Sequence, residues 1–142
     1  AMQDVLKREV LAAKRHQTRL VLVYFDVDNF KEINDKEGHI KGDEVLKYIG
    51  HVMLESIRET DTAYRYGGDE FCLILPDCCI ENARDISEKL IEKFTDKFPN
   101  YSLSIGLTEN GPDEHLEIDA LIKNADAKMY MAKKESGSQV RF

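Results

Sequence analysis

The chain has 142 residues, of which 42% are hydrophobic and 33% are charged, and its formal net charge is -7 at pH 7. This length predicts one compact domain over residues 1–142 and leaves little room for a second. The acidic balance argues against a general nucleic-acid surface, because such surfaces need clustered Lys and Arg to neutralise phosphates. A polyanionic ligand would need metal ions and a few local cations instead.

Neither a membrane span nor a disulfide framework is expected. The longest purely apolar run, residues 20–25, is far shorter than the ~20 residues that cross a bilayer, and no signal-peptide pattern opens the chain. Three cysteines, of which Cys78 and Cys79 are adjacent, match no zinc-binding spacing. We therefore expect a cytoplasmic domain with reduced thiols and without membrane contact.

The first half of the chain predicts a helix, a buried strand and two further helices. Apolar residues at helical spacing predict a first helix that ends near His16, and the apolar run at 20–25 predicts a central strand. A short helix is expected at 30–35. A long amphipathic helix is expected to start near Gly42 and to carry Arg58 in its last turn.

The next predicted element is a β-hairpin with strands at 62–66 and 70–75, the second of which is stopped by Pro76. Its turn contains Gly67 and Gly68. Two glycines between apolar runs favour a two-residue turn whose central residues have positive φ.

The second half predicts a helix at 80–97, a strand at 101–107, a polar loop at 108–117, a helix running towards Lys134 and a short edge strand at 139–142. Together the elements predict an α+β fold. We expect a mixed central sheet of about five strands flanked by helices, with a ferredoxin-like βαββαβ core.

Four carboxylates stand at predicted strand ends. Asp26 and Asp28 follow the central strand two residues apart, so they share a face if the strand continues that far. Asp69 would open the second hairpin strand, and a hairpin beside the central strand could bring Asp69 and Glu70 close to the other two. Mg²⁺ commonly binds one or two carboxylates plus the phosphates of a substrate, and two such ions can stabilise a displacement at phosphorus. The alternative is ordinary solvated side chains, since the chain has 27 Asp and Glu; the glycine turn weakens that alternative for Asp69.

Several motifs, in matching order and spacing, resemble the GGDEF domains of bacterial diguanylate cyclases. The matching residues are Phe25, Asp26, Val27, Asp28, Asn29, Phe30, Lys31, Ile33, Asn34, Asp35, Gly38, His39, Gly42, Asp43, Glu44, Arg65, Tyr66, Gly67, Gly68, Asp69, Glu70, Phe71, Ser104, Ile105, Gly106, Ala125, Asp126, Met129, Tyr130, Ala132 and Lys133. They extend over nearly the whole chain. The resemblance implies the α+β fold of nucleotidyl cyclase and polymerase palm domains.

The resemblance also implies an activity. Diguanylate cyclases condense two GTP molecules into cyclic di-GMP and two pyrophosphates, as each 3′-hydroxyl attacks the α-phosphate of the other GTP. Two Mg²⁺ or Mn²⁺ ions per active site are implied, with Asp26, Asp69 and the Val27 carbonyl as ligands. Glu70 would serve either the second metal or the proton of the attacking hydroxyl. Since each protomer binds one GTP, two active sites must face each other in a homodimer.

By the same resemblance, Asn34 and Asp43 match the positions that read guanine. This role suits their chemistry, because a carboxylate can accept from the guanine N1 and N2 hydrogens and an amide can both donate and accept. The alternative for Asn34 is a turn-forming residue. For Asp43 it is a carboxylate favoured by the dipole at a helix start.

Four further residues are implied to bind the substrate. The backbone around Asn29 and Phe30, at the start of a helix, would turn its free N–H groups to phosphate oxygens. Gly68 belongs to the same substrate-binding group. Lys133 would supply a cation to the terminal phosphates.

A second site is expected upstream of the glycine turn. Arg58 and Asp61 form an RxxD motif that is separated from Gly67 by residues 62–66, and this resembles the product-inhibition site of the family. Arg58 would contact a guanine edge or a phosphate, Asp61 would accept from guanine, and Lys89 would assist. The alternative is a helix-terminal Arg beside an acidic turn residue.

The chain departs from the family pattern at two points. Gly137 stands where the family usually has an Arg that contacts phosphate, and Lys134 could replace that Arg. The chain also starts after the segment that joins such domains to an upstream stalk, so we expect a fragment of a larger signalling protein, either membrane-bound or soluble. The alternative function is a catalytically weak or inactive domain that acts as a receptor for GTP or cyclic di-GMP. A cyclase with mixed purine use is disfavoured by Asp43, because adenine lacks the hydrogens that this carboxylate would accept.

Overall fold

A five-stranded mixed sheet forms the centre of the computed structural model, which describes residues 2–142. The strands are β1 (Leu20–Val27), β2 (Thr62–Arg65), β3 (Glu70–Pro76), β4 (Leu103–Asn110) and β5 (Gln139–Arg141). Their order across the sheet is β2-β3-β1-β4-β5. The first four are antiparallel to their neighbours, whereas β5 is parallel to β4. The predicted α+β fold with a βαββαβ core is confirmed.

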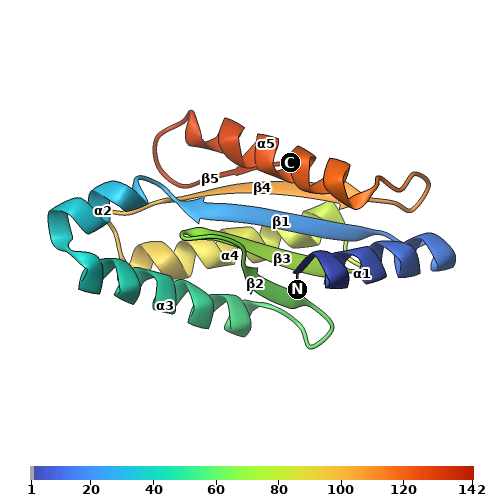
Figure 1. The fold of residues 1–142 in the computed structure, drawn as a ribbon, viewed down its shortest axis with the longest axis horizontal. Helices are drawn as coiled ribbons and strands as arrows, with labels where there is room; N and C mark the ends of the chain where they lie inside the picture. Colours follow the sequence, from blue (N-terminus) through green and yellow to red (C-terminus); the bar gives the residue numbers. More distant parts are fainter. Residues whose placement is uncertain (1) are drawn as a thin grey trace.

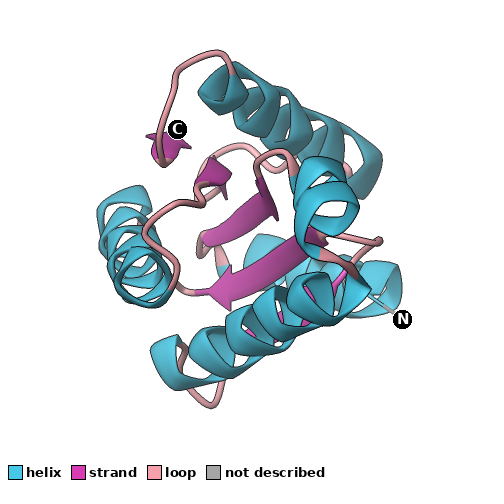
Figure 2. Cartoon of the chain, turned by 90° about the vertical axis from the view of Figure 1, so that its left-hand side faces the viewer, coloured by secondary structure: helices cyan, strands magenta, loops and turns pink. Residues whose placement is uncertain are grey.

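Helices cover both faces of this sheet (Figures 1 and 2). The helices are α1 (Met2–His16), α2 (Phe30–Glu37), α3 (His39–Ser56), α4 (Ile80–Lys97) and α5 (Ile118–Lys133). One hydrophobic cluster joins the sheet to α3 and α4, and a second joins it to α1 and α5. No helix within residues 2–142 is both long and apolar enough to cross a lipid bilayer.

The central strand β1 is buried along its whole length. Val23 and Phe25 belong to the cluster beneath α3 and α4, whereas Leu22 and Tyr24 belong to the cluster beneath α1 and α5. Because neighbouring side chains in a strand point to opposite faces, a strand covered on both faces needs a continuous apolar run. The polar residue Asp26 is therefore the next-to-last residue of a strand that is fixed by packing on both sides.

The boundary between α2 and α3 differs from the prediction. Helix α3 begins at His39 and not near Gly42, because Gly38 adopts a φ of 90° and separates the two helices. The Gly38 N–H donates to the Asn34 carbonyl at 2.9 Å, which closes α2. Helix α3 also ends at Ser56, so Arg58 lies in the following loop and not in the last helical turn.

Strand β4 is shifted along the chain relative to its predicted range of 101–107. It runs from Leu103 to Asn110, because its pairing with β1 continues until Asn110 lies opposite Leu20. The preceding residue Tyr101 stacks on Phe98 instead. The polar loop before α5 is correspondingly shorter than predicted.

Candidate active site

Asp26 is a buried carboxylate at the end of β1. It lies opposite Glu70 of β3 and Ser104 of β4, and only 5% of its surface is exposed. Its Oδ2 atom is 2.6 Å from the Lys133 ammonium, whereas Oδ1 is buried and has no hydrogen-bond partner within residues 2–142. The pKa of Asp26 is raised to about 6, chiefly by burial and to a smaller extent by the Asp69 charge, although Lys133 acts against both. An acidic oxygen is thus held ready to accept a ligand.

The β2–β3 turn that follows is longer than predicted. Strand β2 ends at Arg65 and β3 begins at Glu70, so Asp69 lies in the turn and does not open the strand. Gly67 and Gly68 are not among the residues with positive φ in the part of the chain that the structure describes, where the glycines with positive φ are Gly38, Gly111 and Gly137. The prediction of a two-residue turn with positive φ was therefore wrong.

Backbone and side-chain hydrogen bonds hold this wider turn in place. The Glu70 carbonyl accepts from the N–H groups of both Tyr66 and Gly67. The Arg65 guanidinium donates twice to the Gly68 carbonyl, at 2.7 and 3.0 Å. These bonds hold the turn in place of a tight glycine turn and fix the position of Asp69. The pKa of Asp69 is raised by burial, although Lys133 acts to lower it.

Glu70 is oriented by a residue that the sequence reasoning missed. The Tyr24 hydroxyl donates to Glu70 Oε2 at 2.8 Å, and burial together with Glu70 raises the pKa of Tyr24. The alternation of β1 offers a signal for this contact, because Tyr24 is two residues before Asp26 and therefore shares its face.

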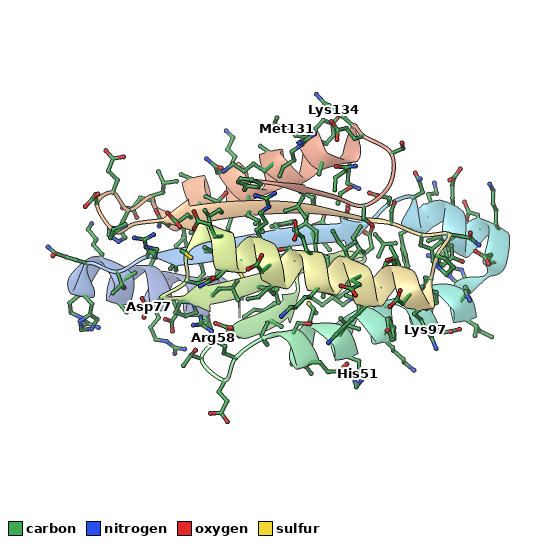
Figure 3. The ribbon with its side chains drawn as sticks, turned by 180° about the vertical axis from the view of Figure 1, so that it is seen from behind. His51, Arg58, Asp77, Lys97, Met131 and Lys134 are labelled. Atoms are coloured by element: carbon green, nitrogen blue, oxygen red, sulfur yellow. The ribbon has the colours of Figure 1, made fainter. Side chains whose placement is uncertain are left out.

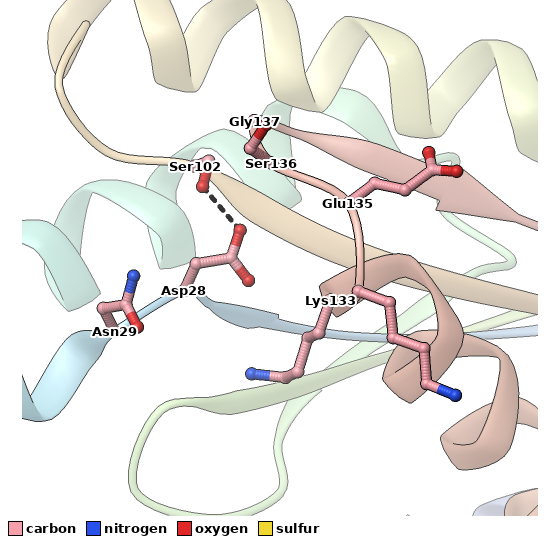
Figure 4. Close-up of a pocket in the computed structure, with 8 residues that line it drawn as sticks. Asp28, Asn29, Ser102, Lys133, Glu135, Ser136 and Gly137 are labelled. Atoms are coloured by element: carbon pink, nitrogen blue, oxygen red, sulfur yellow. Dashed lines mark hydrogen bonds between the residues drawn. The ribbon is translucent and has the colours of Figure 1, made fainter.

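Asp28 does not contribute a free carboxylate to this cluster. Strand β1 ends at Val27, and the Asp28 carboxylate accepts a hydrogen bond from the Ser102 hydroxyl at 2.5 Å (Figure 4). It accepts a second one from the Ser104 hydroxyl at 2.6 Å. Its backbone N–H also donates to the Ser102 carbonyl. Asp28 thus links the end of β1 to the adjoining β4 segment. Its contacts do not support the expectation that it shares a metal-binding face with Asp26.

The donor set suits a hard divalent cation that also binds phosphates. Within residues 2–142, no group of three or more His, Cys, Asp or Glu side chains is arranged as a metal centre. Mg²⁺ does not need such a group, since it usually takes one or two carboxylates and completes its shell with water and substrate oxygens. The unpartnered Asp26 Oδ1, with the turn residue Asp69 raising the pKa of the same carboxyl, fits this demand.

Asn34 of α2 packs against Gly42 of α3, which directly precedes Asp43 in the chain. A Cβ atom at Gly42 would lie 1.9 Å from Asn34 Oδ1, so the amide lies directly against the glycine backbone. Asp43 is the next residue and is exposed. The sequence identified Asn34 and Asp43, but the close approach that requires Gly42 was visible only in the structure.

A cavity of about 400 Å³ opens beside the end of β1 (Figure 4). Asp28, Asn29, Ser102 and residues 133–137 line it. Asn29 adopts a left-handed conformation with a φ of 56° and precedes Phe30, the first residue of α2, so free N–H groups of the helix start lie at this place. The sequence pointed to Lys134 as a replacement for the missing Arg, whereas Glu135 and Ser136 were not predicted to take part.

The RxxD motif forms a closed pair at the opposite end of the sheet. Arg58 donates to both carboxylate oxygens of Asp61, at 2.7 and 3.1 Å, and to the Pro76 carbonyl at 2.7 Å. The Asp61 side chain is fully buried, and its hydrogen bond raises the pKa of Arg58. Pro76 pairs with Leu20, at the far end of β1 from Asp26. Figure 3 shows Arg58 near Asp77 at that end.

This geometry changes the expected role of Asp61. Its carboxylate is occupied by Arg58 and screened from solvent, so here it orients Arg58 and offers no free acceptor. Lys89 is exposed on α4 and forms no hydrogen bond or ion pair with either residue in the part of the chain that the structure describes.

Comparison with known proteins gives the same family across the chain. The family model described as "Diguanylate cyclase, GGDEF domain" matches residues 1–139. The chain is 37% identical to the diguanylate cyclase DosC of Escherichia coli over 99% of its own length and 32% of that protein. It is 38% identical to the diguanylate cyclase DgcS of Shewanella oneidensis over 90% of its length and 44% of that protein. The chain thus spans less than half of these relatives.

Solved structures agree. The GGDEF domain of DgcB from Caulobacter crescentus, in complex with c-di-GMP, superposes with a TM-score of 0.90 at 28% identity, covering 99% of this chain and 87% of that one. The active GGEEF domain of a diguanylate cyclase from Vibrio cholerae superposes with a TM-score of 0.85 at 27% identity, covering 96% of this chain and 91% of that one. With its fold, its motifs and its relatives in agreement, the chain belongs to the GGDEF-domain family of diguanylate cyclases.

Proposed function

We propose that this domain is an active diguanylate cyclase that joins two GTP molecules into cyclic di-GMP. The observation that carries the proposal is the Asp26 carboxylate, which is buried, lies opposite Glu70 of the neighbouring strand and has an Oδ1 atom without a hydrogen-bond partner among the described residues. In each half-reaction, a 3′-oxygen forms a bond to the α-phosphorus of the other GTP. The bond from that phosphorus to the oxygen that bridges it to the β-phosphate breaks, the hydroxyl proton passes to water, and pyrophosphate leaves.

Divalent cations, Mg²⁺ or Mn²⁺, fit the oxygen ligands at this place. Asp26, Asp69, Glu70 and the Val27 carbonyl would hold them, two per active site. Such ions supply charge stabilisation to the attacking and leaving oxygens. The protein contributes carboxylates that are fixed by β1 and by the hydrogen-bonded turn, and so are positioned before the substrate arrives.

Lys133 supplies positive charge between the carboxylates and the cavity. Its ammonium lies 2.6 Å from Asp26 Oδ2 and lowers the pKa of Asp69. It also lines the cavity beside Asn29. We infer that the triphosphate binds there, with Lys133 and the N–H groups around Asn29 and Phe30 facing its oxygens, and Gly68 close to the substrate.

Guanine is proposed to bind at the corner between α2 and α3. The Asn34 amide packs directly against Gly42, so it cannot move further in between the two helices. Asp43 is exposed beside it and can accept from the N1 and N2 hydrogens. Adenine lacks these hydrogens, so the domain should prefer GTP to ATP.

Catalysis requires a second copy of the domain. One site holds one GTP, whereas the product contains two guanylates, so two protomers must place their sites face to face across a twofold axis. We propose a homodimer of this cytoplasmic domain within a larger signalling protein.

The experiment that tests the cyclase proposal is product analysis. The purified chain, at a concentration high enough to form dimers, is incubated with GTP and Mg²⁺ or Mn²⁺ and analysed by mass spectrometry. We expect cyclic di-GMP and pyrophosphate, and their loss in the Asp69→Ala variant. An Asp85→Ala variant, altered at an exposed position of α4, should remain active. Absence of product in the wild type at all dimeric concentrations would reject the cyclase.

Product inhibition through Arg58 is a further part of the proposal. The buried Asp61 holds the Arg58 guanidinium at the protein surface, where half of its side chain is exposed and free to meet a guanine edge or a phosphate. Lys89 would supply additional charge. Relatives support the idea, since the DgcB domain was solved with c-di-GMP bound. If Arg58→Ala leaves the calorimetric affinity for cyclic di-GMP unchanged, this inhibitory site does not exist.

One observation favours a receptor as the second candidate. Gly137 lines the phosphate cavity without a side chain, at the position where the family usually has an Arg. A domain with weak triphosphate binding could act as a receptor, which binds GTP or cyclic di-GMP and passes the signal to a partner protein. Calorimetry that detects binding of either nucleotide, together with absent turnover, would favour the receptor over the cyclase.

A further inference from the structure

Tyr24 and Glu70 form a direct contact across strands β1 and β3. The Tyr24 hydroxyl donates to Glu70 Oε2 at 2.8 Å. Glu70 lies opposite Asp26 in the β1–β3 register, and Tyr24 is two residues from Asp26 on the same strand face. The phenol therefore contacts the Glu70 carboxylate from the sheet face beneath α1 and α5, and it is not one of the residues that line the cavity.

The Tyr24 ring is itself fixed by packing. Only 4% of the residue is exposed. It belongs to the hydrophobic cluster beneath α1 and α5, and its ring meets that of Tyr66 edge-on with centroids 5.6 Å apart. A buried ring with these neighbours cannot swing away without opening the core, so its hydroxyl is a fixed donor.

The contact leaves Glu70 with a single free oxygen. Oε2 is taken by Tyr24, whereas Oε1 accepts no hydrogen bond from the residues that the structure describes. Residues that hydrogen-bond to a metal ligand set its orientation, and their loss commonly weakens metal binding.

We propose that Tyr24 is a positioning residue that holds the Glu70 carboxylate by Oε2 and presents Oε1 to the metal. This inference rests on the proposed function, in which Glu70 takes part in metal binding. It assigns a role to Tyr24 and takes metal binding as the role of Glu70.

The sheet offers a matched control for this proposal. Tyr64 of β2 and Tyr24 of β1 both lie opposite Cys72 of β3, on its two sides. Tyr64 is partly buried against the same hydrophobic cluster. Its hydroxyl makes no hydrogen bond to Glu70. Tyr64→Phe thus removes a hydroxyl from the same surface without touching the carboxylate.

The test measures Mn²⁺ affinity by electron paramagnetic resonance. Each variant is saturated with the unreactive GTP analogue whose α,β-bridging oxygen is a methylene, and free Mn²⁺ is titrated. We expect Tyr24→Phe to weaken Mn²⁺ binding about 10-fold, while Tyr64→Phe stays within about twofold of wild type. Unchanged affinity in Tyr24→Phe, an equal loss in both variants, or no Mn²⁺ binding by the wild type would each overturn the proposal.

A double-mutant cycle tests whether Tyr24 acts through Glu70. In a Glu70→Gln background, Tyr24→Phe should cause little further loss of Mn²⁺ affinity, because the ligand that it positions is already gone. A full additional loss would overturn the proposal. The GTP product assay is separate: a chain that makes no cyclic di-GMP but shows the Tyr24 effect rejects the cyclase and keeps the positioning role. A chain that makes cyclic di-GMP but shows no Tyr24 effect keeps the cyclase proposal and rejects the positioning role.

Discussion

The Lys133 ammonium lies 2.6 Å from Asp26 Oδ2, which joins the last residue of α5 to the end of the central strand. Both groups belong to the proposed GTP site, yet in the free domain they neutralise each other. Burial still dominates the electrostatics of Asp26, since it raises the pKa of that carboxyl to about 6 despite the cation. The buried charge of Asp26 therefore costs free energy in the free domain, and a bound metal ion with a triphosphate can reduce this cost.

The first prediction concerns the pH dependence of stability without metal. The pKa of Asp26 is about 6 in the folded domain against 3.8 for an ordinary Asp side chain, so the folded state binds the proton more tightly between these values. The stabilisation from this group is therefore present at low pH and lost as the pH rises through about 6, by about 3 kcal/mol in total. Urea unfolding with a chelator, at about pH 5 and pH 7, should show the upper part of this loss, about 1.3 kcal/mol, in wild type and a smaller one in Asp26→Asn.

An exposed carboxylate provides the control for this pH effect. Asp85→Asn should retain the wild-type slope of stability against pH, because Asp85 is on the solvent side of α4. If Asp26→Asn also retains that slope, desolvation does not dominate the ionisation of Asp26.

The second prediction concerns Lys133. Lys133→Ala should weaken binding of the unreactive GTP analogue by about 10-fold or more, because a charge-assisted hydrogen bond to phosphate contributes about 1.5–3 kcal/mol. Isothermal calorimetry in the presence of Mg²⁺ measures this loss. Lys123→Ala, which removes an exposed cation from the same helix, should bind the analogue normally. Equal losses in the two variants would mean that only net charge matters.

The third prediction uses two glycines of α3. Gly42→Ala should displace the Asn34 amide, since the new Cβ would lie 1.9 Å from Asn34 Oδ1. We expect a higher KM for GTP and a smaller preference for GTP over ATP. Gly50→Ala has no atom within 4 Å of the new Cβ, so it should keep this preference and gain up to about 1 kcal/mol of stability from helix propensity. A Gly42→Ala enzyme with unchanged base preference would remove Asn34 from guanine recognition.

Patterns of residues predicted the elements well where burial alone determines them. The run that became β1 is buried on both faces, and the apolar spacing of α4 gave its bounds correctly. The prediction failed where a single backbone angle or a register decides the outcome. Gly38, with its φ of 90°, starts α3 three residues earlier than the apolar pattern indicated, and the pairing of β4 with β1 carries that strand on to Asn110.

The candidate site divides in the same way. Residues that carry chemistry by type, such as Asp26, Asp69 and Lys133, could be identified from the sequence because their motifs are distinctive. Supporting residues could not, because their roles depend on contacts between strands. Tyr24 looks like a core residue until the register places it beside Glu70. Asp28 likewise looks like a metal ligand in the sequence, but in the structure its carboxylate accepts hydrogen bonds from two serine hydroxyls.

The fourth prediction concerns the close contact between β4 and α5. A Cβ at Gly106 would lie 2.3 Å from the Ala125 carbonyl oxygen and 2.4 Å from the Met129 nitrogen. Both are backbone atoms, so they cannot rotate away as a side chain can, and α5 must shift as a unit. Gly106→Ala should therefore destabilise the domain by about 2 kcal/mol, within the range for overpacked cores. Thermal unfolding measures this loss, with Gly50→Ala as the glycine control.

The same substitution should also impair substrate binding, because α5 ends at Lys133. A shift of the helix would separate the ammonium from Asp26 Oδ2 and from the cavity beside Asn29. Affinity for the GTP analogue should then fall even at temperatures where the variant is fully folded, because the geometry of a charge-assisted contact is lost. A folded Gly106→Ala domain with wild-type affinity would show instead that Lys133 reaches the phosphates through its own flexibility, and that the close packing of α5 serves stability alone.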